Sequence, residues 1–475
     1  MSGVISEGAA SAEANTAGQP LSDRKTGLLG RIGWVLYDAG GSPYQTLINV
    51  FLFSAYFTTT VIGDPVRGSV IWNYVSAAAA LLLILGGPIA GAIADAGGRR
   101  KPWLAACTLL GAPCMAGLWF ATPHITTGLP LVVACLIGAF VAFEYSQIFC
   151  SALLPGVAPK AKIGLYSGLG YSVGNITAVG LLLFYLAAWQ WSPKPLFGLD
   201  AANHEPQRAV GPMVGLVFLL YALPLFLFTP DAPGAGLSIP QAARQGLKRL
   251  ATTLSKIGDY RNVAVYLMAR LIFNEGFVAV MMLTGIFAGA VLHWRPEMLV
   301  MQGLVNSVVA GFAALIAGWM ADRFGTKPTT IIFLFGVVVV NLVLFSLSPT
   351  SVLFFIPLEP SHGGGMFASL SDKIFLANST LGAVCVIGGY VSTRALMIQL
   401  TPPAMLNEFF GLFFLSGRAA SFLGPLLTGL VIGSFHSIRA GVVIGLAFTI
   451  IGLIIMFFVH EPRDETALPE GVGQA

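Results

Sequence analysis

Long apolar stretches constrain the fold of this 475-residue chain more than any other feature. Each is roughly twenty residues long, which is enough for a helix to cross a hydrocarbon core about 30 Å thick. Hydrophobic residues make up 56% of the chain and charged residues only 10%, whereas soluble domains carry about 25% charged residues. The short alternating segments of a membrane barrel are absent from the sequence. The sequence therefore predicts an all-α, polytopic membrane protein.

The apolar stretches predict twelve transmembrane helices in two groups of six. We expect them at 32–57, 68–95, 103–121, 128–154, 164–190, 211–229, 260–292, 298–321, 328–347, 377–401, 408–435 and 437–459. The polar segment 230–259 separates the groups, and its middle, 239–256, has the spaced apolar and basic residues of a helix lying on the cytoplasmic face. The expected organisation is a disordered tail (1–27), a six-helix bundle (28–229), this linker, a second bundle (260–459) and a cytoplasmic tail (460–475).

A repeated motif follows the second helix of each half. The first copy runs from Gly86 to Lys101 and contains Asp95, and the second runs from Ala317 to Lys327 and contains Asp322. The two aspartates are 322 − 95 = 227 positions apart, about half the chain. In both copies Asp comes four residues after a Gly (Gly91, Gly318) and three before another (Gly98, Gly325). We interpret the motif as a latch at a cytoplasmic turn, in which Asp95 accepts hydrogen bonds from a facing helix end while Arg99, Arg100 and Lys101 hold the loop.

The basic residues outside the spans favour one side of the membrane. Sixteen fall on the side that contains both termini and six on the other, which by the positive-inside rule places the termini in the cytoplasm. The sixteen are Arg24, Lys25, Arg31, Arg99, Arg100, Lys101, Lys160, Lys162, Arg244, Lys248, Arg249, Lys256, Arg261, Arg323, Lys327 and Arg463. The six are Arg67, Lys194, Arg208, Arg295, Lys373 and Arg439.

Six charged residues lie inside predicted spans, where an ionised group needs a partner or a wet cavity. The first half contributes two negative charges, and the second contributes three positive charges and one negative charge. They are Asp38, Glu144, Arg270, Glu275, Arg394 and Arg418, in the first, fourth, seventh, seventh, tenth and eleventh spans. The halves are therefore electrostatically complementary.

The six-plus-six plan, the basic central loop and the repeated turn resemble the major facilitator superfamily. In that superfamily the first, fourth, seventh and tenth helices line a central cavity, and five of the six charges fall on these helices. Helical spacing places Glu144, Gln147 and Ser151 on one face, as it does Arg270 with Asn274 and Tyr390 with Arg394. The candidates for substrate or proton binding are Asp38, Glu144, Gln147, Arg270, Asn274, Glu275, Tyr390 and Arg394. The candidates for gating or structural roles are Gly91, Asp95, Gly98, Arg99, Arg100, Lys101, Asp322 and Arg418.

Two interpretations of the buried charges remain open. In the first, an arginine binds a carboxylate or another anion, while Asp38 or Glu144 holds an ammonium group or a coupling proton. In the second, the charges form salt bridges between helices that lock a gate and never touch substrate. The salt-bridge interpretation is favoured for Asp38, Arg270 and Arg418. For Glu144 and Arg394 the two interpretations are equally supported.

Several stretches resemble the vacuole-effluxer-like family, whose eukaryotic member is an autophagy-related vacuolar amino-acid permease. They are Trp34 to Tyr44, Ser151 to Pro155, Gly164 to Tyr171, Ala269 to Gly276 and, most distinctively, Glu408 to Pro425. The chain departs from the family pattern at Ser151, where Asn is usual, at Glu275, where Asp is usual, and at 175–177, where a Gly pair is usual. These departures lie on helices that could touch substrate, so amino-acid export does not follow from the resemblance alone.

The sequence thus predicts a secondary transporter rather than an enzyme. No catalytic constellation, phosphate-binding loop or paired metal-ligand spacing is present, and the five cysteines fall inside apolar spans. We expect a monomer in the bacterial inner membrane, with no cofactor, metal or nucleic acid, that moves a small polar solute such as an amino acid, outward and coupled to protons. Sodium coupling through Asp38 and the carbonyls of Gly40 and Gly41 stays open. A cation-coupled sugar symporter and a non-transporting receptor or assembly factor are the alternative functions.

Overall fold

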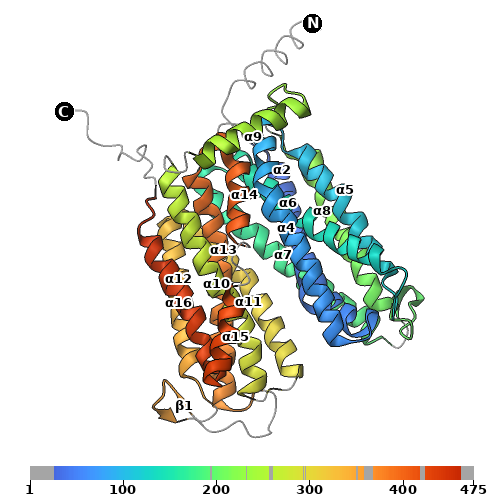
Figure 1. Cartoon of the computed structure of the whole chain (residues 1–475), viewed down its shortest axis with the longest axis vertical. Coiled ribbons are helices and arrows are strands. Elements are labelled where there is room, and N and C mark those ends of the chain that lie inside the picture. Colours follow the sequence, from blue (N-terminus) through green and yellow to red (C-terminus); the bar gives the residue numbers. More distant parts are fainter. Residues whose placement is uncertain are drawn as a thin grey trace, which may run out of the picture.

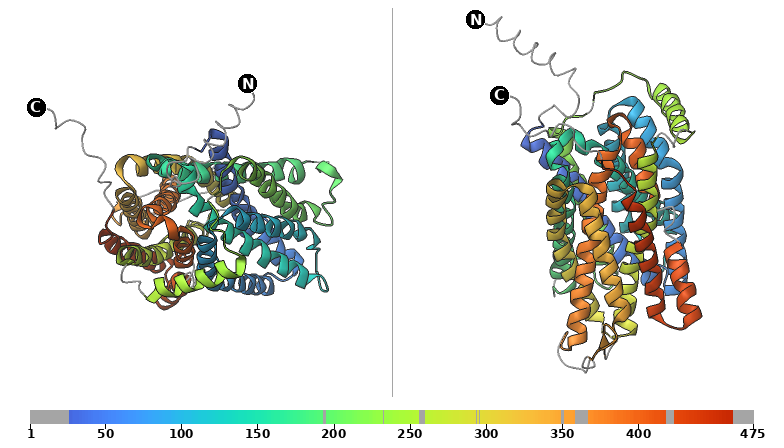
Figure 2. Two further views of the ribbon diagram at one scale, coloured as in Figure 1. Left: turned by 90° about the horizontal axis from the view of Figure 1, so that it is seen from above. Right: turned by 90° about the vertical axis from the view of Figure 1, so that its left-hand side faces the viewer.

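The computed structural model describes residues 26–192, 195–231, 233–255, 260–292, 294, 296–348, 351–357, 367–417 and 423–461. Two groups of long helices lie side by side (Figures 1 and 2). The first half contains α2 (Leu28–Gly40), α3 (Phe53–Tyr56), α4 (Pro65–Gly97), α5 (Lys101–Gly117), α6 (Leu129–Val157), α7 (Ile163–Tyr185) and α8 (Glu205–Phe228). The second half contains α10 (Arg261–Ala290), α11 (Pro296–Phe324), α12 (Thr326–Ser346), α13 (Leu370–Leu400), α14 (Leu406–Ser416), α15 (Leu423–Phe435) and α16 (Ile438–Phe457).

Ten helices of the described residues are long and apolar enough to cross a membrane. Neither the first nor the eleventh predicted span is among these ten: the first is helical but is not one regular α-helix, and residues 418–422 of the eleventh lie outside the described residues. The first breaks after Gly40, where Gly41, Ser42 and Pro43 follow, and continues as π-helical turns (Tyr44–Phe51, Phe57–Val61) around α3. Glycine and proline disfavour a helix interior, and π-turns occur frequently at functional sites.

The described residues of the eleventh span form α14 and α15, and residues 418–422 between them are not described. Helix α14 ends at Ser416, before Gly417, and α15 begins at Leu423, with Gly424 and Pro425 in its first turn. Proline is well tolerated in a first turn because its missing N–H would have no partner there. The resulting helix ends need partners from elsewhere in the bundle.

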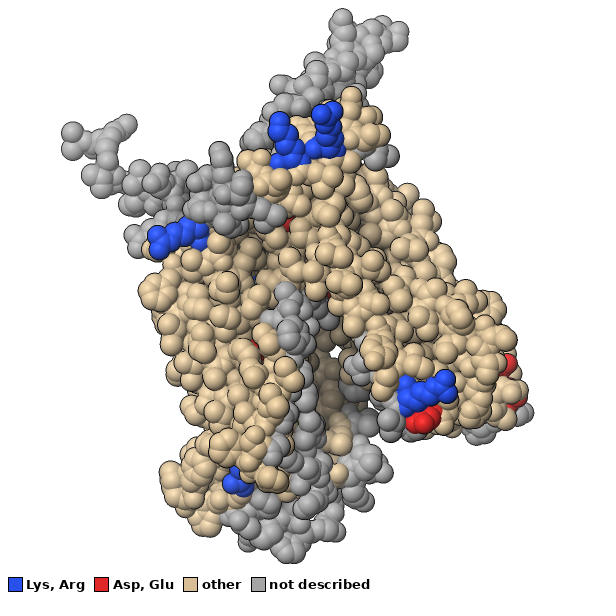
Figure 3. Space-filling model, in the orientation of Figure 1, with Lys and Arg blue, Asp and Glu red and all other residues tan. Residues whose placement is uncertain are grey.

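One end of the bundle is basic and closed. Helices α4 and α11 end there, α9 (Ile239–Ser255) packs against α4, and Arg99, Arg100, Lys101, Arg323 and Lys327 lie at the connecting turns. We call this the basic end. The two halves meet near the basic end and diverge toward the other, where Figure 3 shows a cleft between them. A short hairpin, β1 (Ser351–Val352) with β2 (Ile356–Pro357), lies at that opposite end.

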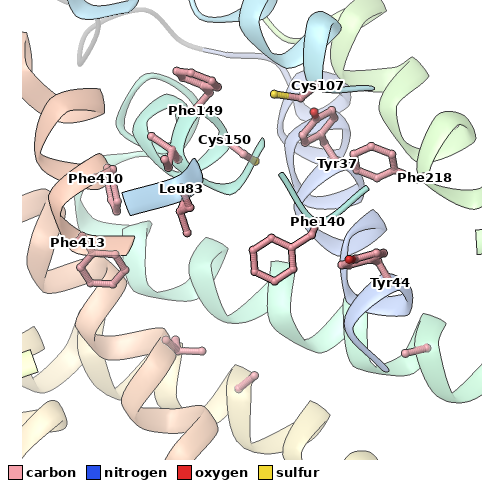
Figure 4. Packing of buried hydrophobic residues seen from close by; sticks show 14 of the residues in the cluster. Tyr37, Tyr44, Leu83, Cys107, Phe140, Phe149, Cys150, Phe218, Phe410 and Phe413 are labelled. Carbon is pink, nitrogen blue, oxygen red and sulfur yellow. The ribbon is translucent and has the colours of Figure 1, made fainter. Parts of the chain in front are cut away.

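Aromatic and aliphatic side chains fill the core of each half and the contact between the halves. Tyr37 of α2 packs against Phe218 of α8 with ring centroids 5.9 Å apart. Phe410 and Phe413 of α14 belong to the same buried cluster as Leu83 of α4, and Figure 4 shows them on neighbouring helices. The second half has a further cluster toward the opposite end, in which Phe287 stacks on Phe375. The contact between the halves is therefore apolar apart from the groups described next.

Candidate functional site

A buried ion pair joins the two halves. Arg394 of α13 donates from Nη1 to both carboxylate oxygens of Asp38 on α2, at 2.7 and 2.9 Å. The exposed fractions of the two side chains are only 3% and 4%. We call Asp38 and Arg394 the central pair. Because the two residues come from opposite halves, the halves cannot separate at this point without breaking the pair.

The rest of the Arg394 guanidinium is held by the first half. Its Nε donates to the Ser167 hydroxyl and its Nη2 to the Ser167 carbonyl, both at 2.8 Å. It also lies 4.8 Å from the ring centroid of Tyr171 and 5.5 Å from that of Trp34. A buried pair of this kind persists only when its remaining donors find partners, and Ser167 supplies them. The Asp38 carboxylate in turn approaches the backbone of α7 closely, where a Cβ at Gly170 would clash with it.

The other predicted site residues on α6 and α13 make contacts of their own. Glu144 is 3% exposed on α6, and Gln147, one turn further along, lies against Gly41. Tyr390 of α13 meets Phe277 edge to face, with centroids 5.4 Å apart. The fourth span is therefore in contact with the first, and the seventh with the tenth.

Three of the candidates on α10 contact the described parts of the eleventh span. Arg270 donates from Nη1 to the Phe413 carbonyl at 2.6 Å and to the Ser416 hydroxyl at 3.1 Å, and it lies over the Phe413 ring. Asn274 donates to the Gly417 carbonyl at 2.9 Å. A cation and an amide donor are what the carbonyl end of α14 needs.

Glu275 contacts the start of α15. Its Oε2 accepts a hydrogen bond of 2.9 Å from the backbone N–H of Gly424, in the first turn of α15. A carboxylate there satisfies a free N–H group and complements the positive end of the helix. These contacts favour structural roles for Arg270, Asn274 and Glu275. The predicted gate residue Arg418 lies outside the described residues.

Both copies of the repeated motif form a contact between the halves. Asp95, at the end of α4, accepts hydrogen bonds from the Asn407 side chain and, at 2.8 Å, from the Glu408 backbone at the start of α14. Asp322, at the end of α11, accepts from the backbones of Gly164 and Leu165 at the start of α7, both at 2.7 Å. We call these the first and second latches. Each aspartate caps a helix N-terminus in the other half, where a negative charge is stabilising.

Small residues let the latched helices approach closely. A Cβ at Gly91 would clash with the Asn407 carbonyl, and one at Gly168 would clash with the Ala314 carbonyl. Gly98 and Gly325 have positive φ angles of 81° and 95°, which side chains with a Cβ rarely adopt. The glycines of the motif therefore serve two purposes, which are tight packing and the turn itself.

The turn after each latch is held in the same way in both halves. The backbone N–H groups of Arg100 and Lys101 donate to Asp231, and the Lys101 ammonium donates to the Phe226 carbonyl. In the second half, Thr326 and Lys327 donate to Glu461, and the Lys327 ammonium donates to the Phe457 carbonyl. Arg100 also lies 3.9 Å from Asp95. Burial lowers the pKa of its guanidinium, and the charges of Asp95 and Asp231 oppose this.

Sequence reasoning missed Asp231, Glu461 and Ser167. The two acidic residues follow the last helix of each half and are 461 − 231 = 230 positions apart, close to the spacing of the latches. That spacing could have identified them as part of the repeat. Ser167 carries no signal of its own, because a serine in an apolar span usually bonds to its own helix.

Solved structures of known transporters share this fold. The chain matches the transporter FucP in the outward conformation with a TM-score of 0.66 at 13% identity, covering 91% of this chain and 98% of that one. It matches the proton:xylose symporter XylE bound to 6-bromo-6-deoxy-D-glucose with a TM-score of 0.64 at 15% identity, covering 91% and 95%. The fold, with its paired halves and repeated latches, is that of a major facilitator superfamily transporter.

Sequence comparisons identify the family. The family model described as vacuole effluxer Atg22 like matches residues 162–467. An uncharacterized MFS-type transporter, YxiO of Bacillus subtilis, is 22% identical over 457 residues, covering 90% of this chain and 94% of that protein. Autophagy-related protein 22 of Cryptococcus neoformans is 22% identical over 307 residues, covering 62% of this chain and half of that protein. The chain belongs to the vacuole effluxer Atg22-like family.

The first latch gives a kinetic prediction. We expect Asp95→Ala to slow transport while the affinity for substrate changes little, because Asp95 caps α14 at the basic end and lies away from the central pair. Loss of a helix cap costs about 1 kcal/mol, which corresponds to a change of roughly fivefold in an opening equilibrium. Initial rates of solute counterflow over a range of concentrations measure both quantities. A large loss of affinity at unchanged turnover would instead place Asp95 in the substrate site.

Proposed function

We propose that this transporter exports a small zwitterionic solute of the amino-acid class, or a related organic anion, in exchange for protons. The central pair carries the proposal, because it places one buried positive and one buried negative group on opposite sides of the contact between the halves. The description of the family as vacuole effluxers supports export. Transport by alternating access requires this contact to open and close in each cycle.

Breaking the central pair without compensation would leave two uncompensated buried charges. Removing one partner of such a pair typically costs about 3–5 kcal/mol. A zwitterion offers compensation for both, since its carboxylate can bind Arg394 and its ammonium group can bind Asp38. A proton on Asp38 would neutralise the carboxylate and release Arg394 to an anionic substrate. In both cases, the contact between the halves opens only when a substrate or a proton binds to the central pair.

The proposed orientation places the basic end in the cytoplasm. The excess of arginine and lysine at this end supports it, so the cleft of Figure 3 would open outward. The similarity to a Bacillus subtilis protein over nearly the whole chain favours a bacterial plasma membrane. The two bundles within one chain suffice to build the central pair and both latches, which favours a monomer.

The central pair also bears on the alternatives. Both Asp38 oxygens accept hydrogen bonds from Arg394, which disfavours a sodium ion held by Asp38 with the carbonyls of Gly40 and Gly41. A neutral sugar would leave both charges of the pair uncompensated, so a zwitterion or anion is the better match. Two latches between the halves favour a transporter, whose halves separate in each cycle, over a non-transporting scaffold, whose halves stay in place.

The test begins with ligands and ends with proton coupling. Amino acids or organic anions are expected to raise the melting temperature of the purified protein, because they bind its folded state. A response to sugars alone would contradict the proposed substrate class. The ligand that responds best then serves as the labelled solute in proteoliposomes.

We expect Asp38→Asn to abolish accumulation of that solute driven by a pH gradient. The amide side chain of asparagine does not titrate, so it cannot bind and release the coupling proton. Exchange of labelled for unlabelled solute at equal pH should persist at a lower affinity, because the amide oxygen of the new side chain can still accept a hydrogen bond from an ammonium group but carries no charge. Asp64→Asn is the control, since Asp64 is exposed and lies before α4 at the opposite end. Its pH-driven accumulation should match the wild type. Unchanged pH-driven accumulation in Asp38→Asn would remove Asp38 from the coupling mechanism.

A further inference from the structure

A cavity of about 470 Å³ lies at the basic end, away from the central pair. It is lined by the turn after α4, the first residues of α5, the end of α8 and the start of the linker. Its lining includes Arg99, Lys101, Pro102, Ala105, Phe226 and Asp231. Two of them are cations and one is an anion.

The charges in this cavity are not balanced. Asp231 is already bound to the backbone N–H groups of Arg100 and Lys101. The Lys101 ammonium donates to one neutral carbonyl, that of Phe226, at 2.9 Å and has two further N–H donors. Arg99 is exposed at the cavity and carries a planar guanidinium with five donors. The cavity therefore presents a net positive charge with several donors available to an anion.

The second half shows which of these groups are needed only to build the turn. There Lys327, Glu461 and the Phe457 carbonyl reproduce the arrangement of Lys101, Asp231 and the Phe226 carbonyl. The second copy is one residue shorter, since Lys327 comes five residues after Asp322, whereas Lys101 comes six after Asp95. It has one basic residue directly before its proline where the first copy has three. Arg99 is therefore not needed to form the turn that the two halves share.

Exposed apolar side chains continue along α5 and α8 from the cavity. Ala105 of α5 lines the cavity, and Leu109, one turn further on, is 72% exposed. Phe226 of α8 also lines the cavity, and Leu223, on the same face, is 48% exposed. Residues three and four apart lie above one another on a helix. The cationic cavity therefore lies at the basic end of two helix surfaces that face the lipid.

We propose that this cavity binds the phosphate group of an anionic phospholipid through Arg99 and Lys101, with the acyl chains along α5 and α8. The phosphate accepts hydrogen bonds from the guanidinium and the ammonium. Because Arg99 adjoins Arg100, which lies beside Asp95, the bound lipid steadies the turn that supports the first latch. A free phosphate compound shares the headgroup chemistry but lacks the acyl chains.

The test uses delipidated protein and two short-chain lipids, dioctanoyl phosphatidylglycerol and dioctanoyl phosphatidylcholine, with glycerol 3-phosphate as the soluble probe. Binding is measured by native mass spectrometry and by the melting temperature. Phosphatidylglycerol should bind more tightly than phosphatidylcholine, and Arg99→Gln should weaken its binding about fivefold, as expected for one basic residue near an anionic lipid. Arg323→Gln is the matched control, because Arg323 is an exposed arginine at the same end.

Three results would overturn the proposal. Equal binding of the two lipids would show that the cavity does not recognise charge. Equal losses in Arg99→Gln and Arg323→Gln would show a general surface attraction rather than a site. Stabilisation by glycerol 3-phosphate as strong as that by phosphatidylglycerol would identify a soluble phosphate compound as the ligand instead of a lipid.

Discussion

Replacing Arg394 with Gln is expected to abolish transport and to lower the melting temperature of the protein. The substitution leaves Asp38 buried without its cation and removes both bonds to Ser167. Loss of one partner from a buried pair costs about 3–5 kcal/mol. Arg394→Lys should restore the charge without the forked contacts, because an ammonium cannot bind the carboxylate and Ser167 in the same geometry. It should recover part of the stability and little of the transport.

The double variant Asp38→Asn with Arg394→Gln separates stability from function. Removing both charges takes away the uncompensated group, so the melting temperature should return toward that of the wild type. Transport should stay absent if the pair binds substrate or proton. Transport that recovers together with stability would show that the pair is only a structural bond.

Arg208→Gln is the matched control for the arginine substitution. Arg208 of α8 donates to the Trp119 carbonyl at 2.8 Å and lies over the Trp119 ring, so it too has carbonyl and aromatic partners. Both residues belong to the first half, and among the described residues their printed partners lie in that half. Arg208→Gln is therefore expected to retain transport. If it also abolished transport, the loss in Arg394→Gln could not be attributed to the contact between the halves.

The fold was predictable because it follows from patterns that repeat along the chain. Apolar length indicates the spans, and the copies around Asp95 and Asp322 indicate the two halves. The latch contact was also within reach, since an aspartate beside glycine at a helix end needs donors and a facing helix start supplies them. Which helix supplies them was not predictable, because that depends on packing between distant segments.

The site was predictable in composition but not in pairing. Burial cost alone singles out the charged residues inside spans, and two of these residues, Asp38 and Arg394, form the central pair. The assignment of Asp38 to Arg394, rather than to Arg270, required the structure. Arg270 instead donates to the Phe413 carbonyl near the end of α14, a contact that depends on packing between distant segments.

A bulky residue at Gly168 is expected to shift the protein toward the state in which the basic end is open. Gly168 of α7 packs against the Ala314 carbonyl of α11, and a Cβ there has no room. Overpacking a close contact costs about 1–3 kcal/mol. Gly168→Val should therefore separate α7 from α11 beside the second latch. Gly180→Val is the control, because Gly180 lies on the same helix and no neighbouring atom lies near its Cβ position.

Distances between spin labels at both ends measure this shift. Labels at Lys160 and Arg323 report on the basic end, and labels at Ala202 and Lys373 report on the opposite end; all four residues are exposed. In Gly168→Val the first distance should lengthen and the second shorten, whereas Gly180→Val should match the wild type. Gly91 packs against the Asn407 carbonyl in the corresponding place of the first latch, so Gly91→Val should shift both distances in the same direction. Identical distances in Gly168→Val and Gly180→Val would mean that the glycine contacts do not control the closure of the basic end.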